Sequence, residues 1–197
     1  LAPERPPGWF ALGISDILDG DAEEGRAHIE RGLRGGVDRL FALETAGRAA
    51  LQADEPQLAN HYLSELLRTP NPSRVGTLDP LQRAVTIYRR ASASNTGVNM
   101  IEDQFPALAA NRGPAGRRAS RVLTSLYQGA GKHRKAFALY EAAIDDTWLK
   151  TDLSHGAIAV LLNNLAYSYA NAGQHLKRAE TLVGLALGFS RRRLASY

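Results

Sequence analysis

The fold of this chain is decided by residues 161–187, LLNNLAYSYANAGQHLKRAETLVGLAL, which hold two apolar stripes on either side of one glycine turn. The first stripe has the spacing of one face of an α-helix, and it consists of Leu162, Leu165, Ala166, Tyr169 and Ala170. The second has the same spacing and consists of Ala179, Leu182, Val183 and Ala186. Gly173 stands between them, where a helix can end in a left-handed conformation that costs glycine little. The stretch therefore predicts a helical hairpin.

The same arrangement of large and small residues occurs near the start of the chain, twice, in a register of 34 residues. The first copy contains Trp9, Leu12, Gly13, Gly20, Gly25, Ile29 and Gly32. Adding 34 to each number gives Leu43, Ala46, Gly47, Asp54, Ala59, Leu63 and Leu66. We expect Gly13 and Gly47 where the two helices of a hairpin approach closely, because a larger side chain there would hold the axes apart.

This pattern resembles the tetratricopeptide repeat (TPR), a 34-residue helix–turn–helix unit. Five copies cover nearly the whole chain, at residues 6–39, 40–73, 78–111, 117–150 and 159–193. The third copy is degenerate, and Pro106 should break or kink its second helix. The fifth has one extra residue between Gly173 and Ala179.

The resemblance implies an all-α fold, a right-handed superhelical α-solenoid in which residues 1–197 form a single repeat array. A helical bundle with accidental periodicity and a related helical solenoid are the alternatives. No polar capping helix follows the last copy, so the chain is interpreted either as an excerpt of a longer repeat protein or as one whose last repeat another subunit covers. Self-association through this uncapped C-terminal repeat is one expectation.

The charge is distributed unevenly along the chain. The net charge is +4, yet residues 1–111 carry 11 basic and 15 acidic side chains, whereas residues 112–197 carry 13 basic and 5 acidic ones. With 44% hydrophobic and 22% charged residues, the chain has the composition of a folded domain. It has no apolar run long enough to cross a membrane. The absence of cysteine excludes disulfides and thiolate chemistry, and leaves the compartment open, with the cytoplasm slightly favoured.

Catalytic and metal-binding motifs are absent from the sequence. The five histidines show no H-E-x-x-H spacing or clustering. No nucleophile elbow, phosphate-binding glycine loop or convincing strand occurs. We therefore expect no enzyme activity, no cofactor and no metal ion.

The remaining place for function is the concave surface, which in TPR proteins is lined mainly by the first helix of each pair. Projecting that pattern onto this sequence predicts partner-binding residues Arg48, Arg89, Arg118, Arg121, Gln128, Asn163, Asn164 and Tyr167. The same projection adds Glu44, Gln82, Thr86 and Ser125. Guanidinium groups pair with carboxylates and amides bond to peptide backbone. This set favours a protein or peptide partner that is acidic or has a free C-terminus.

Arg121 with Asn164 resembles part of the clamp by which some TPR domains hold a terminal carboxylate. The match is partial, because Ser125 stands where that pattern prefers Asn. The predicted role is a non-catalytic scaffold that binds a peptide or protein segment in a concave polar groove. Two alternatives remain open. One is a ligand-sensing regulatory domain of a larger enzyme or transcription regulator, and the other is an RNA-binding helical repeat, which the basic clusters of the second half favour.

Overall fold

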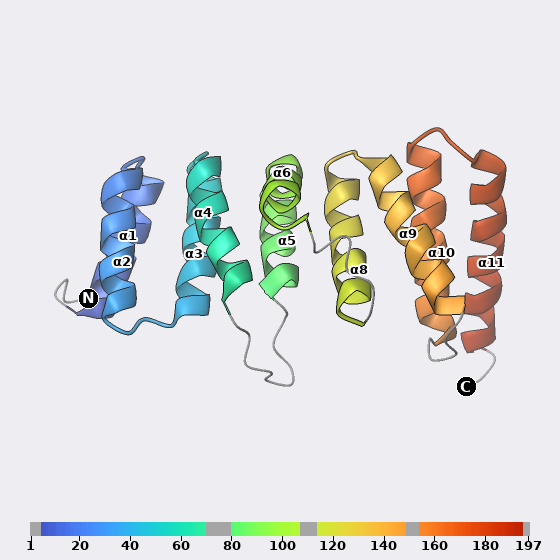
Figure 1. Ribbon diagram of the computed structural model, residues 1–197, viewed down its shortest axis with the longest axis horizontal. Helices are drawn as coiled ribbons and strands as arrows, with labels where there is room; N and C mark the ends of the chain where they lie inside the picture. Colours follow the sequence, from blue (N-terminus) through green and yellow to red (C-terminus); the bar gives the residue numbers. More distant parts are fainter. Residues whose placement is uncertain (1–4, 70–79, 107–113, 149–153, 195–197) are drawn as a thin grey trace. The chain divides into compact units, whose positions relative to one another are not determined.

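In the computed structural model, residues 5–69, 80–106, 114–148 and 154–194 are described, and all their regular secondary structure is helical (Figure 1). The chain divides into two compact units, Leu1–Phe105 (unit 1) and Pro106–Tyr197 (unit 2). The helices of unit 1 are α1 (Pro6–Leu18), α2 (Ala22–Arg34), α3 (Arg39–Gln52), α4 (Pro56–Arg68), α5 (Pro80–Arg90) and α6 (Ser94–Gln104). Those of unit 2 are α8 (Pro114–Gly129), α9 (His133–Trp148), α10 (His155–Asn171) and α11 (Leu176–Leu194).

Consecutive helices pair into antiparallel hairpins, and each hairpin packs on the next within its unit. In unit 1 the hairpins are α1–α2, α3–α4 and α5–α6, and α3 also packs against both α1 and α5. In unit 2 the hairpins are α8–α9 and α10–α11, which meet through α9 and α10. This is the arrangement of a TPR-like α-solenoid, so the predicted all-α fold class is confirmed.

Each hairpin turns in the same way. Five residues in the left-handed region end the first helices, with φ of 94°, 59°, 56°, 69° and 63°: Gly20, Asp54, Ser92, Gly131 and Gly173. In every case the next residue donates its N–H to the carbonyl five positions back, as Gln174 does to Tyr169 over 3.0 Å. These bonds satisfy carbonyl groups that the helix end would leave unpaired. The left-handed conformation predicted for Gly173 is confirmed.

The last hairpin accommodates its extra residue at His175. This residue has φ of 53° and accepts the first backbone bond of α11 from Ala179 over 2.9 Å. In the first hairpin, Asp21 both closes the turn and accepts from Gly25 over 2.9 Å. The insertion therefore adds one residue to the turn and leaves a small residue, Ala179, at the buried position that Gly25 occupies in the first hairpin.

The close approach predicted at the repeat glycines is confirmed. A Cβ atom built on Gly13 would lie 2.5 Å from the carbonyl oxygen of Gly25, so the backbones of α1 and α2 touch at this point. A Cβ on Gly47 would lie 2.7 Å from Cγ of Leu63, which belongs to α4. Glycine is required at the first position because backbone, unlike a side chain, cannot rotate away.

The predicted large and small core positions are buried except at four, of which Trp9 is half-buried. Leu162, Tyr169 and most of the other stripe residues are buried. Ala170 and Val183 are exposed, because each lies about a quarter turn from the centre of its buried stripe. Leu12 is 38% exposed, since α1 packs against α2 and α3 through its other faces.

The degenerate third hairpin ends where its proline predicts. The helix α6 stops at Gln104, and the next residue, Phe105, is no longer helical, since its φ is −134°. Proline disfavours the helical conformation of the residue before it. The predicted break at Pro106 is therefore confirmed.

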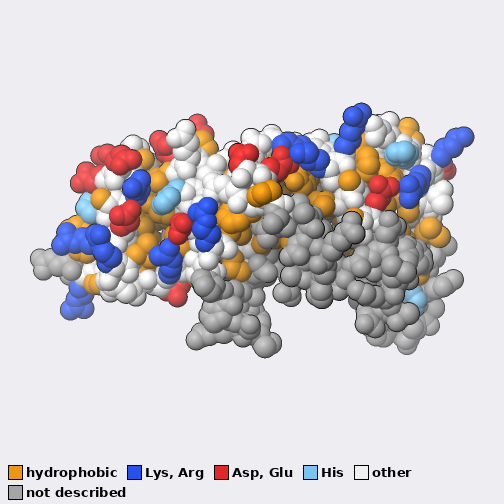
Figure 2. All heavy atoms as spheres, in the orientation of Figure 1, with side chains coloured by type: hydrophobic (Ala, Val, Ile, Leu, Met, Phe, Trp, Pro, Cys, Tyr) orange, Lys and Arg blue, Asp and Glu red, His pale blue; other side chains and the backbone are white. Residues whose placement is uncertain are grey.

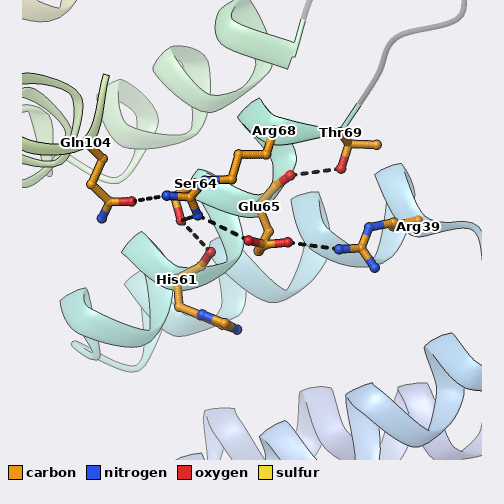
Figure 3. Close-up of polar contacts among 7 residues, drawn as sticks. All are labelled: Arg39, His61, Ser64, Glu65, Arg68, Thr69 and Gln104. Carbon is orange, nitrogen blue, oxygen red and sulfur yellow. Dashed lines mark hydrogen bonds and ion pairs between the residues drawn. The ribbon is translucent and has the colours of Figure 1, made fainter. Parts of the chain in front are cut away.

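A polar network ties the second and third hairpins together (Figure 3). Glu65 on α4 accepts from Arg39 at 2.9 Å and from Arg68 at 3.1 Å. Arg68 reaches across to Gln104 Oε1 on α6 at 2.9 Å, and its guanidinium also lies 5.3 Å from the ring of Phe105. One arginine thus links helices from two hairpins of unit 1.

The last helix keeps an uncovered apolar face among the described residues. Leu176, Val183 and Leu187 share one face of α11 and are 40–60% exposed, whereas Leu185, also exposed, lies on the opposite side of the helix. A Cβ atom added at Gly184 would meet no other atom within 4 Å. Self-association through this helix stays a prediction.

Candidate functional site

A pocket of about 580 Å³ lies between α3 and α5, the first helices of the second and third hairpins. Its lining is partly polar and partly apolar. The lining residues are Glu44, Arg48, Leu51, Gln52, Arg83, Thr86, Ile87, Arg90 and Ala91. All of them belong to unit 1.

Helical spacing places the lining side chains of α3 on one face of that helix, and those of α5 likewise. On α3 the lining residues recur every three or four positions, starting from Glu44 and Arg48. On α5 the same spacing aligns Arg83, Thr86 and Arg90. Thr86 donates its hydroxyl to a carbonyl of its own helix. The charged residues of the described lining are the arginines and one glutamate.

Glu44 holds two of the three arginines in place. It accepts from Arg48 at 3.0 Å on its own helix and from Arg83 at 2.6 Å on α5. The carboxylate side chain is only 23% exposed, and that of Arg83 is 26% exposed, so solvent screens this pair less than a surface pair. Glu44 thereby joins α3 to α5 across the pocket.

Arg90 is exposed on the same face of α5 as Arg83, and no ion pair engages it among the described residues. Among the described lining residues, three guanidinium groups and one carboxylate give a net charge of +2 (3 − 1). A second anionic group is therefore favoured in this pocket on electrostatic grounds.

The residues predicted from the sequence fall partly on this pocket. Glu44, Arg48 and Thr86 line it, whereas Gln82 and Arg89 do not, although both are exposed on α5. The lining stripe of α5 is rotated by one residue toward Arg83 and Arg90, which sequence reasoning missed. Arg89 and Arg90 are adjacent and identical, so the sequence did not indicate which of them would line the pocket.

In unit 2 two of the predicted residues, Gln128 on α8 and Asn164 on α10, are in contact. Gln128 donates from Nε2 to Ser168 Oγ at 3.0 Å and more weakly to the Asn164 carbonyl at 3.4 Å. Asn163 is exposed and Tyr167 is 54% exposed. Ser125 donates its hydroxyl to the Val122 carbonyl at 2.7 Å.

The other two predicted residues of unit 2, Arg118 and Arg121, lie on α8, and their side chains are outside the described part of the structure. The structure thus brings Gln128 and Asn164 together and leaves the partial clamp, Arg121 with Asn164, as a prediction.

The buried tyrosines of unit 1 support the hairpins rather than the pocket. Burial raises the pKa of both Tyr62 and Tyr88 well above the ordinary tyrosine value. Tyr88 donates its hydroxyl to Asn60 Oδ1 on α4 at 2.7 Å. These groups therefore remain neutral at physiological pH.

Metal ligation and membrane insertion have no support in the described residues. These residues contain no group of three or more His, Asp or Glu side chains arranged to hold a metal ion. None of the described helices is long and apolar enough to cross a membrane.

The sequence matches no known family model and no curated protein. The fold is similar to a solved structure from Podosopora anserina, described as a kinesin light chain with nearly identical TPR-like repeats. The two share 17% sequence identity with a TM-score of 0.54, and the similarity covers 96% of this chain and 98% of the other. At this identity the likeness concerns the fold, which is TPR-like. Repeats of this kind generally bind proteins and are usually non-catalytic.

Proposed function

We propose that this chain is a non-catalytic protein-interaction scaffold, and that the pocket between α3 and α5 binds an acidic, extended segment of a partner protein. The observation that carries the proposal is the pocket itself, whose described lining holds Arg48, Arg83 and Arg90 and one carboxylate, that of Glu44. A ligand carboxylate would find Arg90 available and two further guanidinium groups held nearby.

The composition of the pocket fits a peptide better than a small charged metabolite. Leu51, Ile87 and Ala91 give its lining some apolar surface, while Gln52 and Thr86 supply groups that can bond to a peptide backbone. An extended segment could therefore place one acidic side chain, or its C-terminal carboxylate, near Arg90 and a neighbouring apolar side chain on this apolar surface.

The existing ion pairs lower the cost of binding. Glu44 already fixes Arg48 and Arg83, so a ligand need not immobilise two long, flexible side chains itself. Each rotamer-rich side chain that binding orders costs about 0.5–1.5 kcal/mol. A preorganised cationic wall thus supports affinity for an anionic partner.

Selection from a library of random peptides on the immobilised chain tests this proposal. We expect the recovered peptides to be enriched in Asp and Glu together with one apolar residue. They should be lost when the same selection is run on the Arg48→Ala, Arg90→Ala double variant. A variant with Arg26→Ala and Arg34→Ala is the matched control, because it removes the same charge from α2, outside the pocket.

Peptides without acidic enrichment would contradict the proposed specificity. Equal recovery by the pocket variant and the wild type would place binding elsewhere on the chain. Circular dichroism spectra of the variants verify that both are folded, as expected for exposed positions.

A further inference from the structure

The hairpin turns of unit 2 form a strongly basic edge that the pocket of unit 1 does not involve. We call this the basic edge and define it by Lys132, Arg134, Lys135, Lys177 and Arg178. The first three lie at the start of α9 and the last two at the start of α11, so two neighbouring turns contribute. Neither segment, 132–135 or 174–178, contains an acidic residue. Figure 2 shows Lys and Arg side chains projecting at this end of the unit.

The cations occupy positions that are unfavourable for the helices themselves. The N-terminal end of a helix carries a partial positive charge, which prefers Asp or Glu in the first turn. The α2 helix of unit 1 follows this rule with Glu23 and Glu24. By contrast, α9 and α11 have no acidic residue in their first turns, and basic residues stand there instead. The helix ends and the side chains therefore add to one positive potential.

Of three cations in the basic edge, one is paired with a carboxylate, and the charges of the other two are not compensated by a described residue. Arg178, whose side chain is 60% exposed, pairs with Glu141 at 3.1 Å. With its amide oriented to accept, Gln174 receives two bonds from Arg134, at 2.9 and 2.7 Å. Because the Gln174 amide is neutral, it holds the Arg134 guanidinium in place between the two turns but does not cancel its charge. Lys177 is exposed and makes no ion pair with a described residue.

An exposed aromatic ring lies beside the basic edge. Tyr167, near the end of α10, is 54% exposed. Its ring centroid lies 6.4 Å from that of His133, at an interplanar angle of 80°. Because His133 begins α9 between Lys132 and Arg134, this ring stands next to the basic edge. Bases of single-stranded nucleic acids stack on rings of this kind.

We propose that the basic edge binds single-stranded nucleic acid, with phosphates along the lysines and arginines and a base stacked on Tyr167. A nucleic acid fits better than an acidic peptide because its dense charge releases counterions on binding, and because an exposed aromatic ring adds stacking that a Glu-rich peptide cannot use. This activity is separate from the proposed peptide pocket, since the two sites lie in different units.

Fluorescence anisotropy with a labelled oligouridylate strand tests the proposal over a range of salt concentrations. For single strands, log K falls by about 0.7 per phosphate contact for each tenfold rise in salt. At 0.1 M salt each contact is therefore worth roughly fivefold in affinity. We expect Lys135→Gln with Lys177→Gln to weaken binding about 25-fold and to reduce the salt slope by about 1.4.

The aromatic contribution has its own readout. Tyr167→Ala should weaken binding about fivefold or more without changing the salt slope, whereas Tyr167→Trp should retain it. A charge-matched control, Arg26→Gln with Arg89→Gln in unit 1, should leave affinity within about twofold, since these residues are remote from the basic edge in sequence and belong to the other unit.

The proposal would be overturned by absence of binding at low salt, by equal loss in the control and the edge variant, or by binding of oligoglutamate as tight as that of the oligonucleotide. Binding to phosphatidylserine vesicles but not to the oligonucleotide would also overturn it and would assign the basic edge to a membrane surface. Circular dichroism verifies folding, and Lys177→Gln alone gives a milder test at an exposed site.

Discussion

The contact between α1 and α2 at Gly13 allows a sharp test of the hairpin geometry by the substitution Gly13→Ala. The added methyl carbon would lie 2.5 Å from the Gly25 carbonyl oxygen and 2.9 Å from the backbone nitrogen of Ile29. Ordinary van der Waals contact begins near 3.4 Å, so the two helices would have to separate by roughly 0.9 Å (3.4 − 2.5). Both neighbours are backbone atoms, and no rotamer change can relieve the overlap.

The expected magnitude follows from two opposing effects. Overpacking of this kind costs about 1–3 kcal/mol, and the rigid backbone places this site near the upper end of that range. Alanine is about 1 kcal/mol better than glycine inside a helix. We therefore expect Gly13→Ala to lower the free energy of unfolding by about 2 kcal/mol. Gly47→Ala meets the side chain of Leu63, whose Cγ would lie 2.7 Å from the added carbon, so its cost should be smaller than that of Gly13→Ala.

Hydrogen exchange measured by mass spectrometry on separate fragments is the suitable assay, because stability in repeat proteins varies along the chain. Gly184→Ala is the matched control, since a Cβ there has no atom within 4 Å. The control should raise the opening free energy of α11 by about 1 kcal/mol. If Gly13→Ala left the α1–α2 amides as protected as in the wild type, or better protected, the proposed close approach would be refuted.

Three further predictions concern single side chains. Burial raises the pKa of Tyr88, so the stabilising contribution of this residue is complete below the unfolded tyrosine value of 10.0 and is lost as the pH rises above it. The free energy of unfolding in urea should therefore be lower at about pH 11 than at about pH 9, and Tyr88→Phe should reduce this difference. Tyr169→Phe removes a hydroxyl that donates to Glu141 and should cost about 1.5 kcal/mol in thermal unfolding. Glu44→Gln keeps an acceptor oxygen for Arg83 but removes the carboxylate charge found among the described lining residues, so it should increase the affinity for an acidic peptide several-fold by calorimetry, and unchanged or reduced affinity would contradict this electrostatic account.

The hairpins could be predicted from the sequence because their determinants are local. Gly173 ends a helix through its own backbone conformation, and Gly13 lies where two helices that are consecutive in the chain approach closely. The insertion before Ala179 was visible as a break in spacing, although no residue type in that segment pointed to His175 as its place. Short-range chemistry was therefore sufficient for these elements.

The pocket was harder to predict because it depends on how one hairpin is rotated against the next. The left-handed turn residues are spaced by 34 residues between the first two hairpins but by 38 between the next two (92 − 54). On α5, Arg90 rather than Arg89 lines the pocket. The sequence projection already started the third repeat at residue 78, which is 38 residues after the second (78 − 40), yet it selected Arg89, whereas Arg90 lines the pocket.

The pair Arg89 and Arg90 provides the most direct test of the central claim that the α3–α5 pocket binds an acidic protein segment. The measurement is the dissociation constant, by isothermal titration calorimetry, of an acidic peptide recovered by selection, for the wild type, Arg90→Ala and Arg89→Ala. The two variants lose the same charge from adjacent exposed positions, but only Arg90 lines the pocket. We predict about tenfold weaker binding for Arg90→Ala, equivalent to about 1.4 kcal/mol, and no change beyond about twofold for Arg89→Ala. Equal affinities for the two variants would contradict the claim.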